Sequence, residues 1–186
     1  TSELFRPIAK EVEILGSRKT RSIKDRIAAS CQVVAYLKRM ERIHSPELIA
    51  NNESFHRLLT EGINVSYQKN GHAKGDLVWL IDFKNPLNNE YIVANQFTVI
   101  ENGRNKRPDL VLFVNGIPLV FIELKAAHKR LENAYQKNLR DYKDTIPHLF
   151  WFNALIILSN GRDTRIGSMT APWEHISEWK KINSEG

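Results

Sequence analysis

The sequence predicts an α/β or α+β layer fold, in which a mixed β-sheet is flanked by helices. Three observations support it: the first third has helical periodicity, the middle has strand-like segments separated by turns, and the last third returns to a helical pattern followed by strands. The chain has 186 residues, 42% apolar and 26% charged, which suits one globular domain with a sizeable core. We expect a helical N-terminal part (residues 1–68), a core (69–182) and a polar tail (183–186).

The N-terminal part contains two predicted helices. In residues 22–40 the apolar side chains recur at intervals close to 3.6 residues, which is typical of an amphipathic helix. Ser45-Pro46-Glu47 offers a capping residue followed by proline at the first helical position, so a second helix is expected from there to about Thr60. Gly62 is expected to end it.

The middle of the chain has the composition of a β-sheet. Turn signals occur at Lys69-Asn70-Gly71, at Lys74-Gly75-Asp76 and in the loop 85–89. Around them lie segments rich in Val, Ile and aromatic residues, which favour strands. The predicted strands are residues 77–83, 91–100, 110–114 and 117–124.

The last third begins with a helix. Its apolar stripe runs from Lys129 to Tyr142, and Ile146-Pro147 is expected to end it. A buried strand, a tight turn, a short strand and a closing helical segment are predicted to follow, at residues 153–159, 160–161, 164–169 and 173–181.

The composition limits the classes of function. A formal net charge of +6 favours polyanionic partners such as nucleic acid, although a basic and solvated surface explains it equally well. Arg104, Lys106 and Arg107 precede Pro108 directly, and we expect these basic residues at a DNA interface. Cys31 is the only cysteine, which excludes an internal disulfide framework and a cysteine-based zinc cage and favours a cytoplasmic location.

Neither the N-terminus nor the apolar segments of the sequence have the pattern of a membrane or secreted protein. No apolar run approaches the roughly 20 residues of a membrane helix, and the N-terminus lacks the pattern of a secretory signal. The chain begins with Thr1, which suggests that it is a piece of a longer protein.

Asp109, Glu123 and Lys125 form the pattern that carries chemistry. Hydrolysis of a phosphodiester needs a metal ion to activate water and to neutralise the phosphate, and Mg²⁺ takes carboxylate oxygens while keeping several waters. Two carboxylates on neighbouring strands can share one ion, and a lysine beside them can stabilise transition-state charge. Residues two apart in a strand share a face, so Glu123 and Lys125 are expected to point the same way.

Context distinguishes this triplet from similar ones. Acidic-x-Lys triplets also begin at Asp82, Asp141 and Glu178, so the triplet alone is weak support. Glu123 differs because it ends the apolar run 118–122, where an unpaired charge is costly. A strand-end salt bridge to the lysine is the alternative to a metal site, and the context favours the metal site.

The hairpin turn Asn115-Gly116 decides whether Asp109 and Glu123 can meet. A two-residue type I′ loop would leave the two carboxylates on opposite faces of the hairpin. A three-residue loop with a left-handed Gly116 pairs Asp109 with Phe121 and brings both carboxylates onto one face. We therefore predict the bulged loop. A plain turn with no other bulge in the hairpin would contradict the metal site.

The helix after the motif presents Asn138 and Tyr142 on one face, four residues apart. A buried amide and a buried phenol need hydrogen-bond partners. Two interpretations remain open: a satisfied pair in the core, or a pair that lines the site.

Several motifs together resemble the nuclease region of the R (HsdR) subunit of type I restriction enzymes. The first is the run from Arg107 to Lys125 (RPDLVLFVNGIPLVFIELK). The resemblance covers roughly residues 76–180. The other motifs are NQF at 95–97, DYKDTIPHLF at 141–150, LIILSNG at 155–161 and IGSMT at 166–170.

The resemblance implies an endonuclease domain of the PD-(D/E)xK superfamily with a restriction-endonuclease-like fold. In that family the Asp and the Glu of the motif hold Mg²⁺ and the Lys assists hydrolysis. The catalytic residues are then Asp109, Glu123 and Lys125, and the metal ligands are the two carboxylates.

Two departures from the family pattern concern the neighbouring helices. The family carries a Gln-x-x-x-Tyr motif near the DNA; Tyr142 matches it, but Asn138 stands at the Gln position and Gln136 is out of register. The acidic residue that the family's opening helix bears near the site is not recognisable, and Glu53 and Glu61 are the candidate substitutes.

The function implied is Mg²⁺-dependent cleavage of double-stranded DNA without sequence readout of its own, in a complex with methyltransferase and specificity subunits. No Gly-x-x-x-x-Gly-Lys-[Ser/Thr] phosphate loop occurs, so the ATP-driven motor of the family is expected beyond Gly186. One alternative is a non-catalytic DNA-binding or docking module of the same fold, against which the intact site argues. The other is a stand-alone repair nuclease, which a gene ending near Gly186 would favour.

Overall fold

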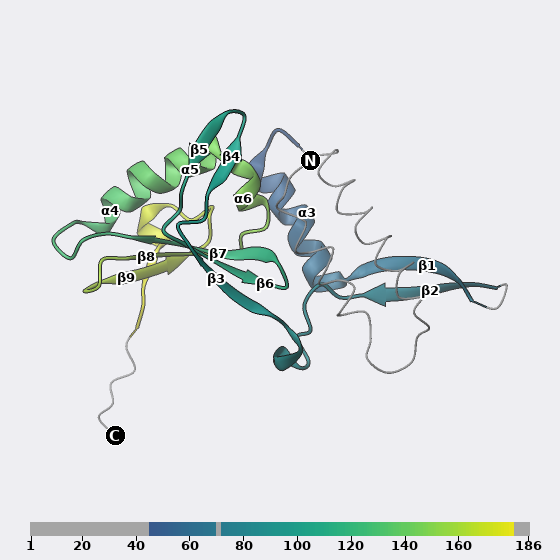
Figure 1. Cartoon of the computed structure of the whole chain (residues 1–186). Helices are drawn as coiled ribbons and strands as arrows, with labels where there is room; N and C mark the ends of the chain where they lie inside the picture. Colours follow the sequence, from purple (N-terminus) through teal and green to yellow (C-terminus); the bar gives the residue numbers. More distant parts are fainter. Residues whose placement is uncertain (1–44, 70–71, 181–186) are drawn as a thin grey trace, which may run out of the picture. The chain divides into compact units, whose positions relative to one another are not determined.

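A computed structural model of the chain describes residues 45–69 and 72–180 (Figure 1). Its contacts divide the chain into two compact units, one made of residues 1–92 with 113–117 and the other of 93–112 with 118–186. The predicted helix at 22–40 and Cys31 lie outside the described residues. Within the described ranges, no helix has the length and apolar character of a membrane span.

Among the described residues, the first unit contains one α-helix and one two-stranded hairpin. Helix α3 (Leu48–Glu61) is the predicted second helix, but it begins two residues after Pro46, with Glu47 as its N-cap in place of Ser45. Gly62 ends it, as predicted, with a φ of 75° and an N–H bond to the Leu58 carbonyl at 3.0 Å. Strands β1 (Ile63–Lys69) and β2 (His72–Val78) then pair in antiparallel register, and a 3₁₀ turn, η2 (Pro86–Asn88), follows.

Two predictions for the first unit are wrong. The strand predicted at 77–83 is β2, which ends at Val78, and the turn predicted at Lys74-Gly75-Asp76 lies inside β2. The reason is the pairing with β1, which was not predicted: seven consecutive residues of β2 each have a partner in β1, and this ladder overrides the turn preference of Gly75.

The main sheet has six strands in the order β10-β9-β8-β7-β6-β3. Strands β7 and β8 are parallel, whereas β8 and β9, and β9 and β10, are antiparallel. The sheet is therefore mixed, as predicted. The strand bounds are β3 (Tyr91–Asn95), β6 (Leu110–Val114), β7 (Ile117–Leu124), β8 (Leu155–Ser159), β9 (Thr164–Gly167) and β10 (Ser177–Glu178).

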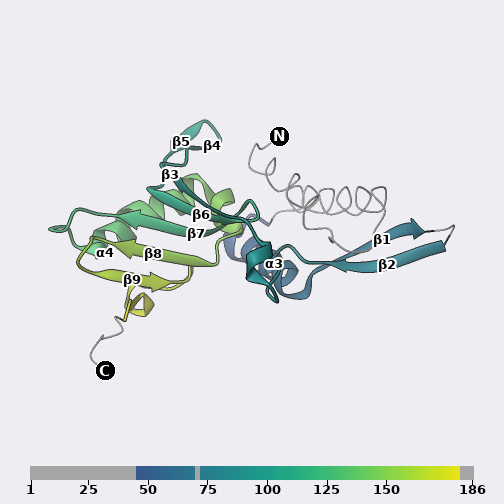
Figure 2. The ribbon, with the colours of Figure 1, turned by 60° about the horizontal axis from the view of Figure 1, so that its bottom comes forward.

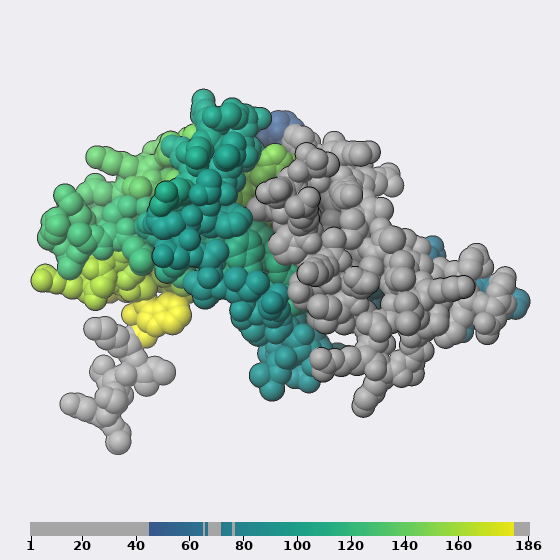
Figure 3. Space-filling view, viewed as in Figure 1, coloured from purple at the N-terminus to yellow at the C-terminus, as the bar shows by residue number. Residues whose placement is uncertain are grey.

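A small hairpin interrupts the strand that was predicted at 91–100. Gln96 has a φ of 53°, which turns the chain at the end of β3. Strands β4 (Val99–Glu101) and β5 (Arg104–Lys106) then form a separate antiparallel pair. In the space-filling view this hairpin is an upright projection in teal (Figure 3).

Helices connect the parallel strands β7 and β8 and lie along one face of the sheet (Figures 1 and 2). They are α4 (Leu131–Asn133), the π-helical segment η3 (Ala134–Leu139), α5 (Arg140–Thr145) and α6 (Pro147–Trp151). The predicted helix is thus confirmed, with a π-helical segment inside it. Beneath these helices, the Phe121 ring packs against those of Tyr142 and Phe150, at centroid distances of 5.6 and 5.3 Å.

The closing helix predicted at 173–181 is wrong. The described residues there form a single 3₁₀ turn, η4 (Trp173–His175), followed by β10. Tertiary contacts override the local preference: Arg165 lies over the Trp173 ring at 4.7 Å, and the Trp179 N–H donates to the Thr164 carbonyl at 2.8 Å.

The predicted three-residue turn between β6 and β7 is also wrong. Asn115 and Gly116 have φ angles of 51° and 76°, the pattern of a plain two-residue type I′ loop, in which the flanking Ile117 directs its backbone groups toward β6. Two residues later, however, the Leu119 carbonyl accepts a bond from Ala154, on the side of β8. In a regular strand, residues two apart direct their backbone groups to the same side. Ile117 and Leu119 face opposite sides, so one extra residue is inserted between them.

That extra residue is Pro118, which has no N–H to donate and is buried next to a buried Ile117. We infer that the bulge shifts the register by one, so that Glu123 comes opposite Asp109; the hydrogen bond from the Leu124 N–H to Oδ2 of Asp109 supports this register. The backbone N–H of Leu124 accordingly faces β6. On this register the two carboxylates share a face of the hairpin, which is what the metal-site prediction requires, although the bulge lies in the strand instead of the turn.

Candidate active site

Asp109 lies immediately before β6, directly after the buried Pro108. Its carboxylate is held from both sides. Oδ2 accepts a hydrogen bond from the backbone N–H of Leu124 at 2.8 Å, and Oδ1 accepts one from Nε2 of Gln96 at 3.2 Å. A carboxylate offers about four lone-pair positions, so both oxygens retain capacity for a cation.

Glu123 lies near the end of β7 with only 2% of its surface exposed. Its Oε1 is 2.6 Å from Nζ of Lys125, so the residues two apart in the strand do point the same way. Its Oε2 is buried and accepts no hydrogen bond from any described residue. A buried carboxylate oxygen without a donor is costly, and this marks Oε2 as a position for a ligand.

The pKa of Glu123 also indicates that too little positive charge surrounds its carboxylate. Burial raises the pKa of the Glu123 carboxyl; the hydrogen bond from Lys125 lowers this pKa, and the nearby charge of Asp109 raises it again. The Asn138 amide lies close enough to favour the ionised form, without donating to Oε2. The net direction is upward, so Lys125 does not fully compensate the buried charge.

The donor set fits a hard divalent cation. The two carboxylates lie close enough for the charge of Asp109 to act on Glu123, and Glu123 has an unpaired buried oxygen. Mg²⁺ is commonly held by one or two carboxylates with waters and phosphate oxygens completing its shell. Among the described residues, no group of three or more Asp, Glu, His or Cys side chains is arranged so that it could hold a metal ion. Glu53 and Glu61, the candidate further ligands, are both exposed on α3.

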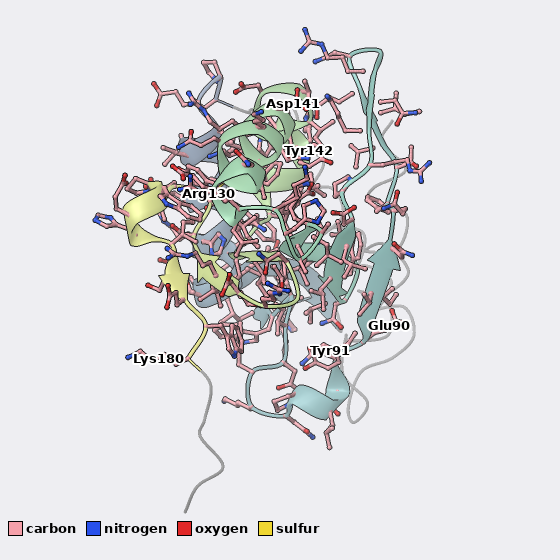
Figure 4. All side chains as sticks on the ribbon, turned by 90° about the vertical axis from the view of Figure 1, so that its left-hand side faces the viewer. Glu90, Tyr91, Arg130, Asp141, Tyr142 and Lys180 are labelled. Carbon is pink, nitrogen blue, oxygen red and sulfur yellow. The ribbon has the colours of Figure 1, made fainter. Side chains whose placement is uncertain are left out.

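Asn138 and Tyr142 lie beside this pair. The half-buried Asn138 belongs to the π-helical segment, and Tyr142, 9% exposed, lies one turn later on α5 (Figure 4). Burial first, then the charges of Glu123 and Asp109, raise the pKa of Tyr142 to about 12. The phenol therefore keeps its proton and donates to the Arg107 carbonyl at 3.4 Å.

The basic residues expected at a DNA interface differ in their surroundings. Lys106 pairs with Asp141 at 2.6 Å, on α5, and Arg107 donates to Oε1 of Gln96 at 2.7 Å. Arg104 is exposed on the β4–β5 hairpin, and no ion pair with another described residue involves it.

Two features were not predicted from the sequence. Gln96 was noted only as part of a resembling motif, yet it contacts both Arg107 and Asp109. The β4–β5 hairpin is attached to α6 because Glu101 pairs with Nδ1 of His148 at 2.5 Å. Neither contact has a local signature, since the partners are 11 to 47 residues apart.

Comparison with known proteins places these features in context. A family model described as "Type I restriction enzyme R protein N terminus" matches residues 5–175. A protein of Methanocaldococcus jannaschii, whose name assigns it provisionally to the endonuclease subunit of type I restriction enzyme MjaIXP, is 35% identical over 153 residues, 80% of this chain. The type I restriction enzyme HindI endonuclease subunit of Haemophilus influenzae is 35% identical over 142 residues, 75% of this chain. The aligned regions span only 15% and 14% of those two relatives.

Proposed function

This chain belongs to the family of type I restriction enzyme R protein N termini, and from that premise we propose that it is the DNA-cleaving domain of such an enzyme. Its reaction is the metal-dependent hydrolysis of phosphodiester bonds in double-stranded DNA. The observation that carries the proposal is the pair of neighbouring carboxylates, Asp109 and Glu123, with Lys125 bound to one of them and one buried oxygen unpaired.

In this reaction the two carboxylates and the lysine would have different roles. Asp109 and Glu123 would hold Mg²⁺, which when bound activates water and neutralises phosphate charge. Lys125 is 21% exposed at its side chain, so its ammonium can remain near Glu123 while it contacts a phosphate oxygen. A fixed positive charge beside the scissile phosphate stabilises the charge that develops in the transition state.

Helix α5 would keep this arrangement in place. Tyr142 donates to the backbone of Arg107, two residues before Asp109, and Asp141 pairs with Lys106. The high pKa of Tyr142 favours a role as a neutral hydrogen-bond donor over that of a general base. Asn138 would line the site, in the place where the family motif has Gln.

DNA would be bound through its phosphates, by exposed groups such as Arg104, and without base readout. We propose that sequence choice comes from methyltransferase and specificity subunits, that an ATP-driven motor belongs to the same enzyme, and that the complex works in the cytoplasm. The family membership and the description of the relatives as endonuclease subunits support a complex with other subunits.

The alternative of a non-catalytic docking module is disfavoured by the unpaired oxygen of Glu123. A site that had lost metal chemistry would be under no constraint to keep a buried carboxylate whose second oxygen has no donor.

Cleavage by the assembled enzyme tests the proposal. Lys125→Ala should abolish DNA cleavage while ATP hydrolysis and DNA binding continue. Lys180→Ala is the matched control, since Lys180 ends another Glu-x-Lys triplet in an exposed position, and it should cleave at the wild-type rate. Full cleavage by Lys125→Ala would refute the assignment.

A further inference from the structure

We propose that Gln96 is a positioning residue for Asp109, held in its working orientation by Arg107. This inference rests on the proposed function, because it concerns how the Asp109 carboxylate is presented to a metal ion. Gln96 precedes the hairpin β4–β5 and follows β3, so it reaches Asp109 from the strand that borders β6 on the side opposite β7.

Gln96 contacts Asp109 at two points. The backbone N–H of Gln96 donates to the Asp109 carbonyl at 2.9 Å, and its side-chain Nε2 donates to Oδ1 at 3.2 Å. The first bond fixes the backbone of Asp109 and the second fixes the rotation of its carboxylate. A single residue thereby restricts the movement of the side chain as a whole.

Arg107 determines which end of the Gln96 amide faces Asp109. A guanidinium can only donate hydrogen bonds, so its contact with Gln96 at 2.7 Å requires the amide oxygen there. The NH₂ group then points at the carboxylate. Reversal of the amide would bring two donors together at Arg107 and two acceptors together at Asp109.

The backbone conformation of Gln96 also indicates that its side chain has a function. Its φ of 53° lies in the left-handed region, where glycine is free of strain and asparagine is tolerated, whereas other residues are uncommon. Such conformations persist where surrounding contacts compensate their cost, often at functional sites. Here the glutamine side chain makes contacts that glycine could not make.

The opposite oxygen of Asp109 has its own donor. Oδ2 accepts from the Leu124 N–H at 2.8 Å, so each oxygen has one fixed donor, from β7 on one side and from Gln96 on the other. Loss of the Gln96 contact would let the carboxylate rotate about the remaining bond. Partners that orient a metal ligand typically contribute 10- to 100-fold to metal affinity.

Two substitutions distinguish the contribution of the Gln96 side chain from that of its backbone conformation. Gln96→Gly removes the amide and accepts the left-handed φ, and Gln96→Asn keeps a shorter amide in a residue that tolerates this φ. Gln136→Gly is the matched control for the loss of an amide that contacts arginine, since Gln136 accepts from Arg140 at 3.4 Å on the exposed side of the helix. Because glycine weakens a helix by about 1 kcal/mol, circular dichroism should accompany each titration.

The probe is Mn²⁺, titrated into the 186-residue chain with the free ion followed by electron paramagnetic resonance. We expect Gln96→Gly to bind Mn²⁺ about 10-fold more weakly than wild type, Gln96→Asn to fall between them, and Gln136→Gly to match wild type. In the assembled enzyme, Gln96→Gly should raise the Mg²⁺ concentration for half-maximal cleavage and leave the maximal rate nearly unchanged. A residue that merely stabilised the fold would not change the Mg²⁺ requirement while leaving the maximal rate unchanged.

The outcomes distinguish this inference from the function on which it rests. Wild-type Mn²⁺ affinity in a folded Gln96→Gly chain would overturn the positioning role and leave the proposed function intact. If the wild-type chain has no Mn²⁺ site that Asp109→Ala removes, both fail. A maximal rate that falls while Mn²⁺ affinity is unchanged would also overturn the positioning role.

Discussion

Nζ of Lys125 lies 2.6 Å from Oε1 of Glu123, and yet the pKa of the Glu123 carboxyl is raised, because burial disfavours its charge by more than the lysine favours it. The second oxygen has no hydrogen-bond donor among the described residues. The ion pair therefore leaves the site short of positive charge. A divalent cation shared with Asp109 would correct this deficit.

Glu123→Gln should stabilise the metal-free chain at neutral pH. The folded protein keeps the Glu123 proton to higher pH than the unfolded chain, whose value is near 4.5. Between the two pKa values the folded state binds more protons, so the free energy of unfolding falls as pH rises through that window. Glutamine mimics the protonated carboxyl and removes this loss. Urea unfolding measured across the window should show a flatter pH dependence for the variant.

Glu178→Gln is the control for this prediction. Glu178 pairs with Arg165 at 3.0 Å, but its side chain is 77% exposed, so the change should be below about 1 kcal/mol at any pH. A Glu123→Gln chain less stable than wild type at neutral pH would mean that the pair with Lys125 outweighs the cost of burial.

Arg104 and Lys106 should contribute differently to DNA binding. Arg104 is exposed, whereas Lys106 is already paired with Asp141. Each phosphate contact contributes about 0.9 to the slope of log K against log salt concentration. Arg104→Ala should reduce the steepness of that slope by about 0.9 in the assembled enzyme, and Lys106→Ala by clearly less. Equal reductions would show that the ion pair with Asp141 opens when DNA binds.

Tyr142→Phe should have a modest effect, because it keeps the ring contact with Phe121 and removes a long bond, 3.4 Å, to the Arg107 carbonyl. The expected cost in the free energy of unfolding is about 1 kcal/mol, against about 3–5 kcal/mol for Tyr142→Ala.

The pH dependence of the same variant gives a second check. With its pKa raised to about 12, Tyr142 stays protonated in the folded protein while the unfolded chain ionises near 10.0. Its contribution to stability is therefore present below that value and is lost as pH rises through the folded pKa. The ratio of wild-type to Tyr142→Phe cleavage rates should be constant from neutral to mildly alkaline pH. A change in that ratio would indicate that the phenol takes part in proton transfer.

Gly62→Ala should destabilise the first unit by about 1–2 kcal/mol. Gly62 ends α3 with a φ of 75°, and a Cβ there would lie 2.9 Å from Cγ of Leu77. Gly75→Ala is the control, since that glycine has no neighbour within 4 Å of an added Cβ. Thermal unfolding of the two variants measures the difference; similar melting temperatures would contradict the assigned strain.

The sequence carried enough information for most elements of the sheet. The apolar segments at 110–114 and 117–124 correspond to β6 and β7, because residues on a buried strand must be apolar whatever their partners. β1 was missed although Ile63, Val65 and Tyr67 alternate with polar residues, a period-2 signal. β5 has no such signal, since Arg104-Asn105-Lys106 is entirely polar and is a strand only because β4 pairs with it.

The candidate site likewise has features that could be predicted from the sequence and features that could not. Asp109, Glu123 and Lys125 were identifiable because charges at the end of an apolar strand are conspicuous. The register that joins them was predicted from the wrong feature, although Pro118 was visible: proline inside a strand flanked on both sides belongs at a bulge. Gln96 could not be assigned from the sequence, because its role depends on a left-handed φ and on partners brought together by β3 and β6.

The most direct test of the central claim is the rate of first-strand nicking by the assembled enzyme carrying Asp109→Asn, Glu123→Gln or both. If the two carboxylates hold one metal ion, each single variant should lose about 100-fold or more, and the double variant should lose little beyond that, because the groups act as a unit. ATP hydrolysis should continue in all three. Full cleavage by either single variant, or losses that multiply in the double variant, would contradict a shared metal site at Asp109 and Glu123.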